Sequence, residues 1–186
     1  MNYLNLFQKI SDEELYHHYI EFEKINNECK YIFVCLPTPM NTDGSCYTGI
    51  VEDLLTKLDK RSEEISQSKI VVVKSTIPPG TTKKWNDKFD NLSVVFNPEF
   101  LTESNSKEQF VNAPHHIIGG HPDAVRGLAT LYDIYSLCTA TDFLFMSASE
   151  AAFVKYGVNA FLATKVTFFN QFFDSVNNYG CNYPTI

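Results

Sequence analysis

Short apolar runs alternate along this chain with segments of helical spacing, and this alternation restricts its fold more than any other feature. Tyr31–Leu36 and Ile70–Val73 are the clearest runs, and each is followed by proline-containing segments that cannot continue a β-ladder. Three later runs fit the same pattern: Leu92–Phe96, His116–Ile118 and Phe143–Met146. Strands alternating with helices at this spacing predict βαβ units and a mostly parallel sheet.

Helical spacing fills the gaps between these runs, over 48–66, 81–89 and 122–135, and a surface helix or two short ones are predicted over 12–27. From Ser147 the pattern changes. Ser147 and Glu150 have the spacing of a capping box, and no proline follows before about Val176. The sequence therefore predicts one long helix there, so rich in phenylalanine that we expect another surface to cover it.

Charge and cysteine content narrow the function classes. The net charge of -7 and the pI near 5.2 argue against a nucleic-acid partner, because such proteins usually present a basic stripe. The five cysteines form no CxxC pair and no set with metal-ligand spacing, so we expect reduced thiols, no metal and a cytoplasmic location. No apolar run is long enough to cross a bilayer, and the N-terminal segment does not resemble a signal peptide.

Polar clusters follow three of the predicted strands: Pro37–Pro39, Ser75–Gly80 and Asn97–Glu103. Ligands of open α/β sheets bind beyond the carboxyl ends of the strands. Each cluster alone is explained by the residue preferences of ordinary turns. The three together favour a binding site at this edge of the sheet.

The order of several motifs carries a resemblance. The chain is similar to the UDP-glucose/GDP-mannose dehydrogenases over about residues 20–180, in Val34-Cys-Leu-Pro-Thr-Pro39 with Asp43-Gly-Ser45, Lys74-Ser-Thr-Ile-Pro-Pro-Gly-Thr-Thr82, Asn97-Pro-Glu-Phe-Leu-Thr-Glu103, Ile117-Ile-Gly-Gly120, and Glu150 with Lys155, Asn159 and Ala160-Phe-Leu-Ala-Thr-Lys165. Each motif is modestly specific, whereas their shared order is highly specific.

The resemblance implies an α/β fold, with the later part of a Rossmann-like NAD-binding domain and its mostly parallel sheet in 1–146. It places a long central dimerisation helix and the start of the next domain in 147–186. It also implies the family reaction, in which the C6 alcohol of UDP-glucose or GDP-mannose is oxidised to a carboxylate with two NAD molecules through a cysteine thioester. The implied partners are the nucleotide sugar and either a second copy of the chain or a complementing dehydrogenase fragment. Nucleic acid and membrane are not expected as partners.

Residue by residue, the resemblance implies a set of catalytic and ligand-binding positions. Lys155 and Asn159 match donors to the developing alkoxide, and Glu99 resembles the general base. Thr76 matches a threonine that positions water and cofactor. The NAD-binding set is Leu36, Pro37, Thr38, Pro39, Ser75, Thr76 and Glu103, and the substrate-binding set is Glu99, Phe100, Leu101, Thr102, Glu103, Lys155 and Asn159. We expect the lysine, the amide, the hydroxyl and the two carboxylates to surround one pocket.

The chain also departs from the family pattern. Ser104 stands where the family usually has glycine, and Thr102 and His116 stand where arginine is common. No Gly-x-Gly-x-x-Gly turn occurs to hold a cofactor pyrophosphate, and Cys181 does not match the family nucleophile. We therefore expect an internal stretch of such an enzyme, inactive by itself.

Two alternatives remain open. The first alternative to a dehydrogenase is a module that kept the fold and a helix-mediated dimer but lost catalysis. The second is an unrelated α/β nucleotide-binding domain. The presence of Thr76, Glu99, Glu103, Lys155 and Asn159 favours the dehydrogenase, because a module freed from catalysis has no physical reason to keep these groups together.

Overall fold

The computed structural model describes residues 27–139 and 142–185, and five strands within them form one sheet. The strands lie across the sheet in chain order: β1 (Tyr31–Val34), β2 (Lys69–Val73), β3 (Leu92–Phe96), β4 (His115–Gly119) and β5 (Asp142–Met146). The strands β1 to β3 are parallel, and so are β4 and β5. Only β3 and β4 meet antiparallel, through the pair Phe96 and Gly119. The predicted mostly parallel α/β sheet is confirmed.

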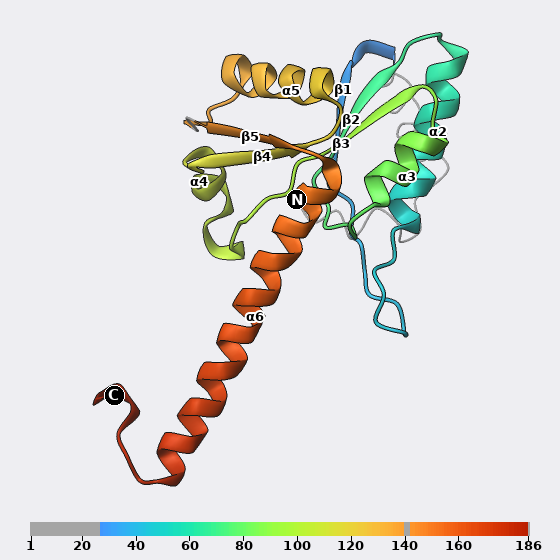
Figure 1. Cartoon of the computed structure of the whole chain (residues 1–186). Helices are drawn as coiled ribbons and strands as arrows, with labels where there is room; N and C mark the ends of the chain where they lie inside the picture. The colour runs from blue at the N-terminus through green and yellow to red at the C-terminus, as the bar shows by residue number, and fades with distance from the viewer. Residues whose placement is uncertain (1–26, 140–141, 186) are drawn as a thin grey trace, which may run out of the picture.

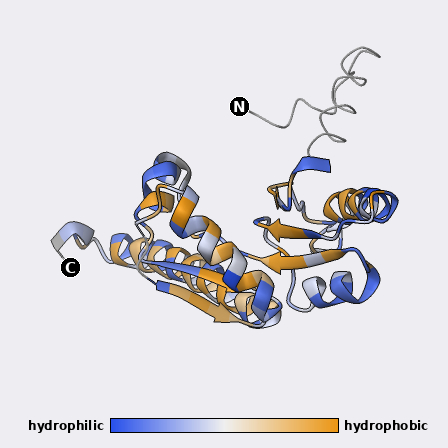
Figure 2. Ribbon diagram, turned by 90° about the horizontal axis from the view of Figure 1, so that it is seen from above, coloured by the Kyte–Doolittle hydropathy of each residue, from blue (hydrophilic) through white to orange (hydrophobic). Residues whose placement is uncertain are grey.

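Helices cover both faces of the sheet (Figure 1). The helices α2 (Gly49–Glu64) and α3 (Thr81–Lys88) lie on one face, and α5 (Pro122–Tyr135) lies on the other. Successive strand residues alternate between two cores. Val71, Val73, Val94 and Phe96 pack with α2 and α3, whereas Val72, Val95 and Ile118 pack with α5. Burial on both faces explains why the inner strands β2 and β3 are continuously apolar in sequence and hydrophobic in Figure 2.

Some element boundaries differ from the sequence predictions. β1 ends at Val34, before the predicted Leu36, because its ladder with β2 stops there and the Leu36 carbonyl accepts the Ser75 hydroxyl at 2.6 Å instead. The 3-10 turn η2 (Glu103–Asn105) and the short helix α4 (Ser106–Val111) were not predicted. Residues 12–26, where a surface helix was predicted, lie outside the described part of the chain.

The long helix predicted from Ser147 is α6 (Ala148–Asn178). The Ser147 hydroxyl accepts the Glu150 N–H at 3.2 Å, and the Glu150 carboxylate accepts the Ser147 N–H at 2.8 Å, so the capping box is formed. The helix starts in close contact with β4. A Cβ atom at Gly119 would lie only 2.7 Å from the Cα of Ala148, so this approach requires glycine at position 119.

Beyond its first turns α6 leaves the sheet and extends as an arm (Figure 1). Every residue in 157–175 is exposed, including Phe161 at 68% of its surface. Near its far end Phe172 and Phe173 contact Tyr183 of the 3-10 turn η3 (Tyr183–Thr185), which folds back on the helix. Nothing else among the described residues covers this phenylalanine-rich surface, which stays a predicted interface. None of the described helices combines the length and apolarity needed to span a bilayer.

Candidate active site

The loop after β3 meets α6 at the carboxyl edge of the sheet. The Lys155 ammonium donates a hydrogen bond to the main-chain oxygen of Glu99, and it lies 5.1 Å from the centre of the Phe100 ring. Burial lowers the pKa of Lys155, and the nearby negative charge of Glu99 opposes this shift. Two residues that the sequence placed in one site are therefore brought together from elements more than fifty residues apart.

A second lysine lies on the other side of Glu99. The ammonium of Lys74, at the end of β2, is 3.9 Å from the Glu99 carboxylate and donates to the Asn97 side-chain oxygen at 3.1 Å. Burial lowers the pKa of Lys74, with Glu99 acting in the opposite direction. The Lys74 side chain is only 7% exposed, whereas that of Glu99 is 44% exposed. The Glu99 carboxylate thus lies near a buried cation while it stays accessible to solvent.

Asn97 connects this pair to the core. Its side-chain oxygen also accepts the Tyr132 hydroxyl at 2.7 Å, and its amide nitrogen donates to the Ile117 carbonyl at 2.7 Å. Asn97 is fully buried, and burial raises the pKa of Tyr132, which keeps that hydroxyl protonated. One amide therefore joins β2, β4 and α5 behind the candidate site.

His116 of β4 lies beside this network. Its ring stacks on Tyr132 and Phe143, with centroids 5.2 Å and 5.9 Å away, and it is 5% exposed. Burial, with a smaller contribution from the Lys74 charge, lowers the pKa of His116 below its ordinary 6.5. A neutral imidazole is consequently favoured in the folded chain.

The lowered pKa of His116 predicts a stability that depends on pH. Below about pH 6.5 the unfolded chain binds more protons at this residue than the folded chain does, so stability is lost as the pH falls toward the lowered folded value. Urea unfolding at about pH 7.5 and about pH 5.5 measures this loss, which His116→Phe is expected to reduce. The exposed His115→Phe is the control, and an equal loss in His116→Phe and the unaltered chain would contradict the prediction.

The loops after β1 and β2 are tied to each other. The Thr38 hydroxyl donates to the Thr76 carbonyl at 2.7 Å, and the Ser75 hydroxyl donates to the Leu36 carbonyl. Thr38 and Thr76 line a cavity of about 450 Å³ together with Tyr156 of α6. This brings together members of the predicted NAD-binding set.

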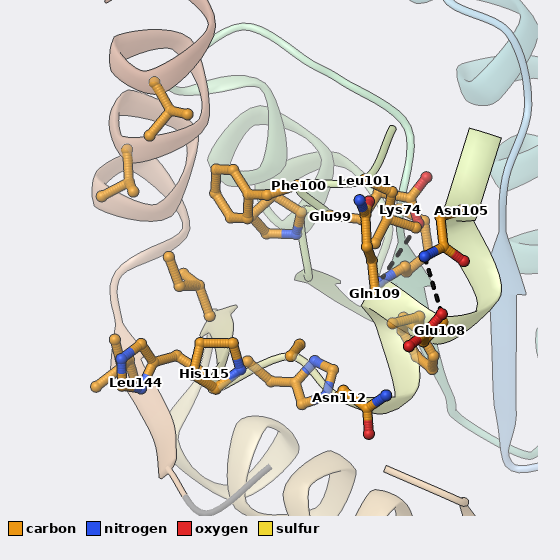
Figure 3. Close-up of a pocket in the computed structure, with 18 residues that line it drawn as sticks. Lys74, Glu99, Phe100, Leu101, Asn105, Glu108, Gln109, Asn112, His115 and Leu144 are labelled. Atoms are coloured by element: carbon orange, nitrogen blue, oxygen red, sulfur yellow. Dashed lines mark hydrogen bonds and ion pairs between the residues drawn. The ribbon is translucent and has the colours of Figure 1, made fainter. Parts of the chain in front are cut away.

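A larger cavity, of about 630 Å³, lies on the other flank of α6 (Figure 3). Glu99, Phe100 and Leu101 line it, facing Val154 and Val158 of α6. Successive helix residues are 100° apart, so Val154 and Val158 face one cavity, Tyr156 faces the other, and Lys155 lies between them. Thr76 and Glu99 consequently line different cavities in this structure.

The remaining predicted residues are placed as follows. Asn159 follows Lys155 by one turn and is exposed, and its side chain makes no hydrogen bond within 27–139 and 142–185. The Thr102 N–H donates to the Gln109 side-chain oxygen at 2.7 Å, which fixes the loop against α4. The side chain of Glu103 lies outside what the structure describes. Pro37 and Pro39 are exposed at the end of β1.

Sequence reasoning missed the buried network behind the loop. Lys74, Asn97, Tyr132 and His116 were not proposed as a group, although two signals were present. A lysine directly follows the Val71–Val73 run, and an asparagine directly follows β3. A polar residue at the end of a strand buried on both faces needs a partner.

Comparison with known proteins identifies the family of this chain. Residues 4–139 match the model of the UDP-glucose/GDP-mannose dehydrogenase family, NAD binding domain. The chain belongs to this family. The resemblance read from the motifs is thereby confirmed.

Individual relatives agree with the family match. The chain is 32% identical over 158 residues to a putative UDP-glucose 6-dehydrogenase, YtcA, of Bacillus subtilis, covering 81% of this chain and 36% of that protein. It is 32% identical over 156 residues to a UDP-glucose 6-dehydrogenase of Pseudomonas aeruginosa, covering 77% of this chain and 33% of the relative. The chain thus spans about a third of the length of these curated relatives.

A solved structure has the same fold. A GDP-mannose dehydrogenase from Pseudomonas aeruginosa, crystallised as a ternary complex, superposes with a TM-score of 0.75 at 27% identity, over 87% of this chain and 39% of that one. The fold of this chain is therefore shared with a GDP-mannose dehydrogenase.

The family domain takes NAD, as the sequence predicted. The residues present fit one side of such a site. The Thr38, Ser75 and Thr76 loops are joined by hydrogen bonds at the carboxyl edge of the sheet. The 186 residues contain no Gly-x-Gly-x-x-Gly turn to hold the pyrophosphate. Among the described residues no group of three potential metal ligands lies together.

Proposed function

We propose that this chain forms part of the active-site wall of a nucleotide-sugar 6-dehydrogenase, which oxidises the C6 alcohol of UDP-glucose or GDP-mannose to the uronate. The observation that carries the proposal is the contact between Lys155 of α6 and the main-chain oxygen of Glu99. It sets a cation from the helix against a carboxylate-bearing loop, and both residues match the family motif. NAD, when bound, accepts the hydride in each of the two oxidations.

The chain's own groups have distinct roles in this proposal. Lys155 and Asn159 lie one helical turn apart, so both can donate to an alkoxide oxygen as charge develops on it. Glu99 takes up a proton from the water that cleaves the thioester, and the buried Lys74 holds its carboxylate in place. Thr76 orients water and cofactor, because a hydroxyl donates and accepts at once. Phe100, Leu101 and Thr102 border the sugar nucleotide, and Glu103 lies near both ligands.

Thr76 lies across α6 from the cavity that Glu99 lines, so a bound ligand has to pass over the carboxyl edge of the sheet to contact both. This agrees with a substrate and a cofactor that approach from opposite flanks of Lys155. The thioester-forming cysteine has no match among the five cysteines of the chain. The reaction therefore requires a cysteine from outside these 186 residues, and the uncovered face of α6 is the proposed contact for the part that carries it, in a cytoplasmic enzyme of polysaccharide precursor synthesis.

Two features favour a second candidate, a catalytically inactive assembly module that pairs through α6. Asn159 makes no hydrogen bond among the described residues, and the chain has Ser104 in place of the usual family glycine. Under this alternative the fold and the helix remain, and the chemistry is lost.

One experiment separates the two functions. The purified chain is mixed with NAD and either UDP-glucose or GDP-mannose, with and without any polypeptide encoded beside it, and NADH absorbance is followed. We expect no turnover by the chain alone and turnover in the complemented mixture. Stable association with the second polypeptide but no binding of either ligand would instead identify the assembly module.

A further inference from the structure

The cavity between α4 and α6 has features that the proposed dehydrogenase reaction does not use. Its walls are mainly apolar, with Phe100 and Leu101 from the loop, Leu144 from β5, and Val154 and Val158 from α6. Figure 3 shows Phe100 and Leu144 on opposite sides of the opening. A volume of about 630 Å³ lies in the range of small-molecule sites.

The polar floor of this cavity is built from buried side chains. Lys74 and His116 both line it, with 7% of the Lys74 side chain and 5% of His116 exposed. The His116 Nε2 atom is buried and has no hydrogen-bond partner among the described residues. The Lys74 ammonium donates one hydrogen bond, to Asn97, while its 3.9 Å separation from Glu99 exceeds hydrogen-bond length. The floor therefore has unused hydrogen-bonding capacity.

Two side chains at the rim of the cavity are already hydrogen-bonded within the chain. Both polar atoms of the Gln109 side chain are bonded to Thr102, and the Asn105 amide donates to Glu108 at 2.9 Å. A ligand is consequently recognised at the floor, where burying a polar group without a partner is costly.

Charge at the floor selects the kind of ligand. The Lys74 cation and the Glu99 anion offset each other, and Glu108 adds a negative charge at the rim. An anion is therefore disfavoured, and a neutral group suits the floor better. A hydroxyl accepts from an ammonium and pairs with an imidazole nitrogen in either tautomer.

We propose that this cavity binds a small neutral molecule with an aromatic body and a hydroxyl group, the hydroxyl lying between Lys74 and His116 and the ring lying between Phe100, Leu144 and Val158. The inference goes beyond the proposed function. The cavity shares Glu99, Phe100 and Leu101 with the proposed substrate wall, whereas Thr76, Lys155 and Asn159 do not line it, so binding there is tested separately from sugar oxidation.

The test is a titration of the 186-residue chain with three probes that share a tolyl group, monitored by ¹H–¹⁵N NMR. The probes are p-cresol, toluene and p-toluate. We expect saturable shifts of residues around the cavity with p-cresol, at a dissociation constant of about 1 mM. Toluene and p-toluate are expected to bind about tenfold more weakly, because the first lacks the hydroxyl and the second carries a negative charge.

Three variants localise the effect. His116→Phe is expected to weaken p-cresol binding toward that of toluene, because only the Lys74 partner of the hydroxyl remains, while leaving toluene binding unchanged. Val158→Trp fills the cavity and is expected to abolish binding of all three probes. Val166→Trp adds the same side chain two turns further along α6, where the helix is exposed, and is expected to change nothing. The amide spectrum of each variant reports its folding.

Several outcomes would overturn the proposal: no saturable binding of p-cresol, equal affinities for p-cresol and toluene, or unchanged binding in Val158→Trp. A p-cresol affinity that weakens as the protein concentration rises would also overturn it, because a second chain would then be the occupant of the cavity.

Discussion

Replacing Asn97 with leucine is expected to lower the free energy of unfolding by about 3–5 kcal/mol. Leucine has the same branching and the same number of side-chain heavy atoms as asparagine, so the loss is expected mainly from hydrogen bonds. Lys74, the Tyr132 hydroxyl and the Ile117 carbonyl would each lose a partner in the core. A buried ammonium that loses a partner accounts for most of the cost. Against a typical total stability of about 5–15 kcal/mol, the variant would be close to unfolding.

Urea denaturation measures this effect, with Asn105→Leu as the matched control. Asn105 is exposed and bonds through its side chain to Glu108, so its replacement is expected to change stability by less than about 0.5 kcal/mol. Adding Lys74→Met to Asn97→Leu is expected to restore part of the loss, because the buried charge is then gone. A cost below about 1 kcal/mol for Asn97→Leu would mean that the network does not stabilise the fold.

Replacing Lys155 with methionine is expected to lower kcat of the complemented enzyme by about 10²–10³-fold, the usual cost of losing one donor to a developing oxyanion. Methionine is one heavy atom shorter but keeps the unbranched apolar stem of the side chain, so the helix contact with Phe100 is largely retained. The effect is therefore expected in kcat more than in KM, because the lost interaction strengthens in the transition state.

Lys165→Met is the control for this substitution. Lys165 lies on the same helix, is exposed and is distant from the Glu99 loop, so kcat is expected to stay within about twofold of the original. NADH formation in the complemented mixture provides both measurements. Equal losses in the two variants would indicate a general effect of charge on assembly and would remove Lys155 from the proposed chemistry.

The sheet was predictable because its signals are local. Strands buried on both faces, such as Ile70–Val73, appear as continuous apolar runs, and the capping box at Ser147 and Glu150 marks the start of α6 by spacing alone. The six-residue helix α4 was missed because so few residues show no helical periodicity, and its position depends on contacts such as that of Gln109 with the Thr102 loop.

The candidate site was only partly predictable. The contact between Lys155 and Glu99 followed from family motifs, but motifs do not fix the direction of a side chain. Thr76 and Glu99 both follow strands at one sheet edge, yet α6 passes between the cavities that they line. The stack of His116 on Tyr132 joins residues from two elements that share no sequence pattern, so only the fold reveals it.

The anchoring of α6 at one end has a mechanical consequence. At about 1.5 Å per residue, the helix from Lys155 to Asn178 carries the chain about 35 Å from the Glu99 loop. The helix is a stiff spacer, and its phenylalanine-rich far end is too distant to touch a ligand bound near Lys155 in the same chain. The far end of the helix affects such a ligand only through other molecules that it binds.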